Sequence, residues 1–257
     1  MILIYDGSYE GFLSAVFDAY ALRVADGALI RPEGRDCVLP LEEWRDAARS
    51  AEKAERVTKK LHALGLAETV FDAWLSRDSE IENNLLGVIA LAIREGNSPM
   101  ERLYLDSVRA VAGAARRVRT EAHRFLQFVR FVKVESKRPA LTDGGEAPGL
   151  YVADIEPEYD ILPKIAGHFA RRFQDQRFII RDKVRNQALV YDTKACQIVT
   201  FPEIMAPPLP NDAQFERLWR RYFDSVAIPW RKNLKLQQHF VPKKYRKHLT
   251  EFQNRHR

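Results

Sequence analysis

The sequence predicts an α+β protein with an antiparallel sheet at its centre and helices at both ends, and three observations indicate this. Apolar residues recur at helical spacing through most of residues 1–128. Between residues 129 and 201, short apolar runs bounded by turn residues give the order strand, strand, helix, strand, strand, strand (β-β-α-β-β-β). Residues 213–257 return to helical spacing. An antiparallel sheet with a helix on one face, packed with further helices, satisfies all three.

The first region, residues 1–128, is expected to hold one strand and then a series of helices. The apolar run at residues 1–5 indicates a buried strand, and Ser8, which follows a turn, can cap the next helix. Turn residues at Gly65, Asp78 and 96–99 then separate the helical patterns. The further helices expected here cover residues 50–65, 67–76, 81–95 and 100–128.

The second region, residues 129–201, is expected to form the sheet. A helical pattern between Ile161 and Phe173 interrupts its strands, and four prolines between residues 202 and 212 indicate a linker. The basic segment 213–257 follows, although all three regions could form one domain. The expected strands cover residues 128–134, 150–155, 177–181, 188–191 and 197–201.

Composition limits the classes of protein and site. Apolar residues make up 46% of the chain, which is enough for a sizeable core. No apolar run approaches the ~18 residues of a membrane span, and the first residues lack a basic leader, so we expect a cytoplasmic protein. The two cysteines, Cys37 and Cys196, lie far apart without further ligands at metal spacing. We expect no disulfide, no metal site and no cofactor.

Charge is distributed unevenly along the chain. Residues 1–115 carry a net charge of −6, residues 116–138 carry +6, residues 139–212 carry −3 and residues 213–257 carry +9. Two short segments therefore hold the whole positive excess, which predicts a polyanionic partner. The alternative is that these segments are solvated helix faces on an ordinary basic protein.

The segment from Trp230 to His248 combines the residue types that bind nucleic acid. Lysine and arginine neutralise phosphates, asparagine and glutamine can read base edges, and aromatic rings stack on unpaired bases. A solvated amphipathic terminal helix is the alternative. The candidate contacts are Arg231, Asn233, Lys235, Gln237, Lys243, Lys244 and Tyr245.

A second basic segment spans the end of the expected helix 100–128 and the strand after it. Arg116, Arg119 and His123 fall at positions i, i+3 and i+7, so they share one helix face. Arg124 and Arg130 are further candidate contacts with nucleic acid. Neutralisation of this segment by Glu121, or by acidic residues of the first half, is the alternative.

A third set of polar residues surrounds the expected helix 161–173 and the hairpin after it. Arg172 and Arg185 are candidate contacts with nucleic acid, although an Asp182–Arg185 ion pair that fixes the hairpin is the plainer explanation of Arg185. His168, like His123, is a candidate proton carrier because histidine titrates near neutral pH, and the alternative for His168 is a structural residue whose ring is satisfied within the fold. The acidic residues between Asp154 and Asp160 alternate, but Pro157 interrupts the strand that would align them for a metal.

Four strings in the chain together resemble a family of uncharacterised bacterial proteins described as DNA metabolism or DNA repair proteins. The C-terminal string departs from that family, whose pattern reads Met-Pro followed by a Tyr-Trp pair, so that only Tyr245 remains for stacking. The strings, in order, are residues 4–12 (IYDGSYEGF), 121–131 (EAHRFLQFVRF), 160–163 with 168–173 (DILP and HFARRF) and 231–237 (RKNLKLQ).

The resemblance implies a partner more than an activity. Members of this family are encoded beside a radical-SAM protein, and similar domains occur fused to uracil-DNA glycosylase-like domains. The present sequence lacks the three closely spaced cysteines that hold a radical-SAM iron–sulfur cluster. It would therefore accompany such chemistry and not perform it.

The sequence thus leads to one main hypothesis and two alternatives. The main hypothesis is a nucleic-acid-binding accessory protein of DNA repair or metabolism, which binds DNA in preference to RNA and works with a radical-SAM partner. The first alternative is an enzyme that acts on nucleic acid with a histidine and arginine site. The second is an adaptor that binds an acidic protein. No self-sufficient catalytic motif is present, so the sequence leaves open whether the protein is an enzyme.

Overall fold

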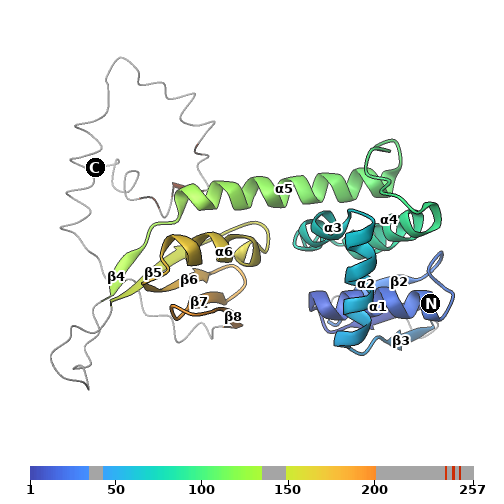
Figure 1. Ribbon diagram of the computed structural model, residues 1–257, viewed down its shortest axis with the longest axis horizontal. Helices are drawn as coiled ribbons and strands as arrows, with labels where there is room; N and C mark the ends of the chain where they lie inside the picture. The colour runs from blue at the N-terminus through green and yellow to red at the C-terminus, as the bar shows by residue number, and fades with distance from the viewer. Residues whose placement is uncertain (35–42, 135–148, 201–240, 242–244, 247–248, 250–257) are drawn as a thin grey trace, which may run out of the picture. The chain divides into compact units, whose positions relative to one another are not determined.

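The computed structural model describes residues 1–34, 43–134, 149–200, 241, 245–246 and 249 (Figure 1). The chain divides into two compact units, residues 1–120 (unit 1) and residues 121–257 (unit 2). The boundary lies inside the helix α5, Asp106–Phe128, which the sequence predicted as one continuous helix from residue 100 to residue 128. Each unit is described by itself.

Unit 1 contains a small parallel sheet that the sequence predicted only in part. The strands β1 (Ile2–Tyr5), β2 (Leu29–Pro32) and β3 (Trp44–Asp46) lie in the order β2-β1-β3, and β1 pairs parallel with both neighbours. Only β1 was expected. Because β2 has four residues and β3 has three, neither is long enough to show a clear alternation of apolar and polar residues.

The helix α1 (Tyr9–Ala21) begins at the predicted cap, Ser8. The Ser8 hydroxyl oxygen accepts the N–H of Gly11 at 2.9 Å, and Asp6 Oδ1 accepts the N–H of Ser8 at 2.9 Å. Asp6 turns so closely over the helix that a Cβ on Gly11 would lie 2.0 Å from Asp6 Oδ1. A side chain at position 11 would therefore displace the Asp6 carboxylate from its place over the start of α1.

The other helices of unit 1 agree with the sequence pattern. They are α2 (Ala51–Ala63), α3 (Ala67–Trp74), α4 (Ile81–Glu95) and the first part of α5. The helix α4 ends at Gly96, whose φ of 74° is the left-handed conformation that glycine adopts easily. The helix α5 begins at Asp106, later than expected, because residues 99–105 form turns.

A buried polar cluster joins the sheet of unit 1 to its helices. The Tyr5 hydroxyl donates to Glu82 Oε1 at 3.0 Å and accepts from Trp74 Nε1 at 3.2 Å. Burial raises the pKa of the Tyr5 hydroxyl above its ordinary value, and the nearby Glu82 carboxylate raises it further. This network fixes the end of β1 against α3 and α4.

Unit 2 contains a five-stranded sheet whose strands follow the predicted order along the chain. The strands lie side by side in the order β4-β5-β6-β7-β8. The pairs β4–β5, β6–β7 and β7–β8 are antiparallel, but β5 and β6 are parallel. The bounds of the strands are Val132–Val134 (β4), Leu150–Ile155 (β5), Arg177–Asp182 (β6), Gln187–Tyr191 (β7) and Cys196–Thr200 (β8).

The prediction of a purely antiparallel sheet was therefore wrong at one pair of strands. The helix α6 (Leu162–Arg172) connects β5 to β6 and returns the chain to the end from which β5 started. A strand, helix, strand connection of this kind makes the two strands parallel. The fold is α+β with a mixed sheet.

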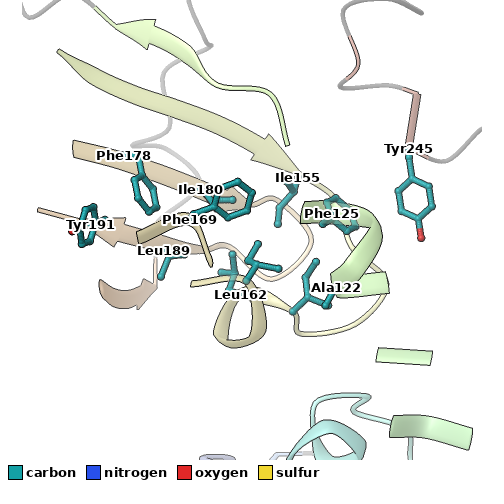
Figure 2. Packing of buried hydrophobic residues seen from close by; sticks show 12 residues of the cluster. Ala122, Phe125, Ile155, Leu162, Phe169, Phe178, Ile180, Leu189, Tyr191 and Tyr245 are labelled. Atoms are coloured by element: carbon teal, nitrogen blue, oxygen red, sulfur yellow. The ribbon is translucent and has the colours of Figure 1, made fainter. Parts of the chain in front are cut away.

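The core of unit 2 lies between the sheet and the helices on one of its faces. Phe178 of β6 is 1% exposed, and its ring lies within 6.4 Å, centre to centre, of the rings of Phe131, Phe169 and Phe173. Figure 2 shows side chains of α5, α6 and the strands directed into this one cluster. No helix among the residues that the structure describes is long and apolar enough to cross a membrane.

Candidate nucleic-acid interface

One face of α6 gathers basic residues and a histidine. Leu162, Ile165 and Phe169 turn the other face of the helix into the core. Positions 164, 168 and 171 follow one another at i, i+4 and i+7, so their side chains share a face. We call this surface the α6 basic face, and it consists of Lys164, His168, Arg171 and Arg172.

His168 has the most unusual environment on this face. Its Nε2 is buried, and within the described part of the chain it has no hydrogen-bond partner. The ring meets the Phe169 ring edge-on, with the centres 5.3 Å apart. A buried ring nitrogen without a partner is costly, because it has lost its bond to water. His168 therefore holds a buried polar atom on α6 that no described protein group satisfies.

The two arginines at the end of α6 are exposed, and neither is neutralised by a carboxylate among the described residues. Arg172 places its guanidinium carbon 5.6 Å from the centre of the Phe173 ring. Cations in the last turn of a helix are favoured by the helix dipole, which accounts for their position. Their remaining N–H groups face solvent and can bind phosphate oxygens.

The C-terminal end of α5 lies beside α6 within unit 2. Ala122 and Phe125 of α5 belong to the same buried cluster as Leu162 and Ile165 of α6, and Figure 2 shows Ala122 and Phe125 close to Leu162. The exposed side of this part of α5 carries His123 and Arg124. The end of the second basic segment and the helix α6 thus pack on the same core, through Ala122 and Phe125 on the α5 side.

The basic groups at this end of α5 make local contacts. The Nε2 atoms of His123 and Gln127 lie 3.2 Å apart, and Arg130 Nη1 donates to the Gln127 carbonyl oxygen at 2.7 Å. The Arg124 guanidinium carbon lies 5.9 Å from the centre of the Tyr245 ring. Arg124 is half-exposed and has no carboxylate partner among the residues described. It is a further cation of unit 2 without a described carboxylate partner.

Tyr245 lies in the core, whereas the sequence predicted an exposed ring for stacking on bases. Its side chain is 5% exposed, and its ring centre lies 5.3 Å from that of Phe125 and 5.6 Å from that of Phe128. The Tyr245 hydroxyl donates to Glu121 Oε1 at 3.2 Å. Tyr245 therefore anchors this part of the chain to α5 and presents no free ring face to a base.

Comparison with known proteins identifies a family. The model of a domain of unknown function, DUF4130, matches residues 79–251. The chain belongs to this family. No curated protein matches the chain, and no solved structure does.

The DUF4130 match includes the whole α6 basic face and the end of α5, and it begins just before α4. It leaves out residues 1–78 and therefore the parallel sheet of unit 1. The candidate interface thus belongs to the part of the chain that defines the family. Lys164 was missed by the sequence analysis, although its position four residues before His168 could have indicated it.

Acidic residues neutralise part of the second basic segment of this DUF4130 protein within unit 1. Arg117 Nη2 lies 2.5 Å from Asp78 Oδ2, and Arg119 Nε lies 3.5 Å from Oδ2 of the fully buried Asp72. These contacts agree with the alternative interpretation of this segment. Arg116 is exposed and has no carboxylate partner within the described ranges.

The hairpin between β6 and β7 contains the ion pair that the sequence suggested. Arg185 Nη1 donates to Asp182 Oδ2 at 2.9 Å and to the Pro157 carbonyl oxygen at 3.2 Å. Asp182 also accepts the N–H of Val184 at 2.9 Å, and burial raises the pKa of the Asp182 carboxyl even though Arg185 opposes the shift. Arg185 therefore fixes this turn of the DUF4130 fold.

The remaining candidates are the acidic residues near Asp154 and the basic residues of the C-terminal segment. Asp154 pairs with Arg181, and no group of three metal-binding side chains occurs among the described residues. The other candidates lie outside the residues that the structure describes: Arg231, Asn233, Lys235, Gln237, Lys243 and Lys244.

Proposed function

We propose that this DUF4130 protein binds nucleic acid, DNA in preference to RNA, through the α6 basic face. One observation carries the proposal: Arg171 and Arg172 are exposed, unneutralised by described carboxylates, and adjacent to a histidine whose buried Nε2 has no described partner. A guanidinium can donate two parallel hydrogen bonds to phosphate oxygens, so two exposed arginines suit contact with a nucleic-acid backbone. The charge of +9 on residues 213–257 supports the same conclusion.

The biological role that we propose is that of an accessory protein in DNA repair or metabolism. The resemblance of four strings in the chain to proteins of that description supports this role, and it also supports a radical-SAM protein as the partner. The candidate interface offers cations and a histidine and, within the described residues, no cluster of metal ligands. These groups suit binding and positioning of a polyanion.

Replacing Arg171 and Arg172 together by glutamine is expected to weaken DNA binding by about tenfold at low salt and to reduce the salt slope by about two. The physical reason is that the variant neutralises two fewer phosphates, so its binding releases fewer counterions from the DNA. The measurement is fluorescence anisotropy of labelled single-stranded DNA, duplex DNA and RNA of equal length across a salt titration.

The matched control is Arg45→Gln with Lys59→Gln, which removes two exposed cations from unit 1. Lys59 pairs only with the exposed Glu55 at 2.8 Å, so its loss has little effect on stability. The control should keep the original salt slope. Equal losses in both double variants, or no binding of the unaltered protein to any of the three nucleic acids, would contradict the proposal.

A second candidate function is an enzyme that acts on nucleic acid, and the buried Nε2 of His168 favours it. An unbonded imidazole nitrogen beside cations can carry a proton to or from a bound substrate. Incubation of labelled DNA with the protein should then give a product that His168→Gln abolishes, while binding measured by anisotropy stays within about twofold. If no product forms, or if His123→Gln has the same effect as His168→Gln, this candidate fails.

A further inference from the structure

A hollow in unit 1 is lined by residues of the helices α1, α2 and α4. Its volume is about 210 Å³. The walls that remain partly open to solvent are Phe17 and Tyr20 of α1, Val57 of α2 and Ile93 of α4. Apolar side chains that remain half-buried around one concave site are typical of surfaces that bind another molecule.

Two cations of α2 stand at the edge of this hollow. Arg56 places its guanidinium carbon 4.9 Å from the centre of the Phe17 ring, and Lys60 lies one helical turn further along the same face. Both residues are exposed, and neither has a carboxylate partner among the residues described. The hollow therefore combines an apolar interior with positive charge at its edge.

The neighbouring lysines of α2 differ from these two cations. Lys53 Nζ lies 2.7 Å from Asp18 Oδ1, and Lys59 Nζ lies 2.8 Å from Glu55 Oε1. Along this helix, Lys53 and Lys59 are thus paired with carboxylates, whereas Arg56 and Lys60 have no carboxylate partner among the described residues. Residues 1–115 carry a net charge of −6, so this positive edge is not part of a generally basic surface.

The size of the hollow indicates what kind of group fills it. Pockets for small organic ligands usually have volumes of about 300–1,000 Å³, and this hollow is smaller. A single large apolar side chain inserted as an anchor fits such a volume, and anchors of this kind dominate the energetics of protein interfaces. Carboxylates next to the anchor would meet Arg56 and Lys60.

We propose that this hollow is a docking site for an acidic segment of a partner protein, which inserts one leucine, phenylalanine or tryptophan and pairs its carboxylates with Arg56 and Lys60. The site lies in unit 1, and it is independent of the α6 basic face in unit 2. The proposal therefore adds a protein-binding function to the proposed binding of nucleic acid.

The test is selection of random 16-residue peptides displayed on phage against the immobilised full-length protein, followed by affinity measurements on the synthetic consensus peptide. We expect the selected peptides to share a large apolar residue next to aspartate or glutamate. Arg56→Glu and Lys60→Glu should each weaken binding of the consensus peptide by about tenfold or more. Val57→Phe, which fills the hollow, should have an effect of similar size.

The matched control is Lys59→Glu, which makes the same charge change on the same helix but on the side away from the hollow, and it should change the affinity by less than about twofold. Circular dichroism of each variant confirms that the helices are retained. The proposal is overturned if the consensus lacks carboxylates, if Arg56→Glu and Lys59→Glu have equal effects, or if the peptide responds instead to the Arg171→Gln and Arg172→Gln double change.

Discussion

Replacement of Phe178 by alanine is expected to lower the free energy of unfolding of unit 2 by about 3–5 kcal/mol. Phe178 is 1% exposed, and its ring contacts Phe131, Phe169, Phe173 and Tyr191 at centre-to-centre distances between 5.0 and 6.4 Å. Alanine would remove the ring from the centre of the cluster and leave a cavity that these neighbours cannot fill without moving. Urea unfolding followed by far-UV circular dichroism measures the change.

The control for this prediction is Ile198→Ala on β8, a residue of unit 2 that is 42% exposed. Because the Ile198 side chain is already in contact with water, its truncation should lower the stability by about 0.5 kcal/mol or less. If Phe178→Ala had as small an effect as Ile198→Ala, the cluster around Phe178 would not be the core of unit 2.

Replacement of Arg181 by methionine is expected to be equally severe, at about 3–5 kcal/mol. Arg181 Nε and Nη2 donate to the two carboxylate oxygens of Asp154 at 2.5 and 2.9 Å, and the side chains are only 10% and 12% exposed. The register pairs these two residues directly across β5 and β6. Loss of the guanidinium would leave a nearly buried carboxylate without its opposite charge.

Simultaneous replacement of Asp154 by leucine and Arg181 by methionine should restore most of the lost stability, because neither of these two positions then holds an uncompensated charge. Urea unfolding of the two single variants and the double variant gives the coupling free energy. Additive losses in the double variant would show that the ion pair is not a unit. The cycle also tests the parallel pairing of β5 with β6, since only that register brings these residues opposite each other.

The helices of this chain could be predicted from sequence because each carries its own local signal. Ser8 caps α1 as expected, and α4 has the predicted bounds at Ile81 and Glu95. The strands β5 to β8 were found for the same reason, since their alternating or continuous apolar runs lie between clear turns.

Strand pairing was predicted less well, because it depends on contacts between distant parts of the chain. The sequence shows that a helix separates β5 from β6, but the prediction treated the sheet as antiparallel throughout. The strands β2 and β3 could not be recognised because their stability comes from pairing with β1 and not from a pattern of their own. Intrinsic strand preference is weak compared with this context.

The candidate site was predicted in part. His168 and Arg172 lie together on α6 as their spacing indicates, and the Asp182–Arg185 pair fixes its turn. The burial of Tyr245 could not be foreseen, because the aromatic spacing of a basic segment is the same whether a ring faces a base or the core. The partners Asp72 and Asp78 of the α5 arginines are likewise distant in sequence.

The buried position of Tyr245 bears on the proposed binding of nucleic acid, because it fixes one end of the basic C-terminal segment. The end of β8 at Thr200 and the ring of Tyr245 both belong to unit 2, so the basic residues between them are tethered to this unit at both ends. A strand of nucleic acid bound at the α6 basic face would meet those residues at a high effective concentration. Under the proposed function, contacts from these two parts of the chain would be multivalent, and their combined avidity would exceed the affinity of either part alone.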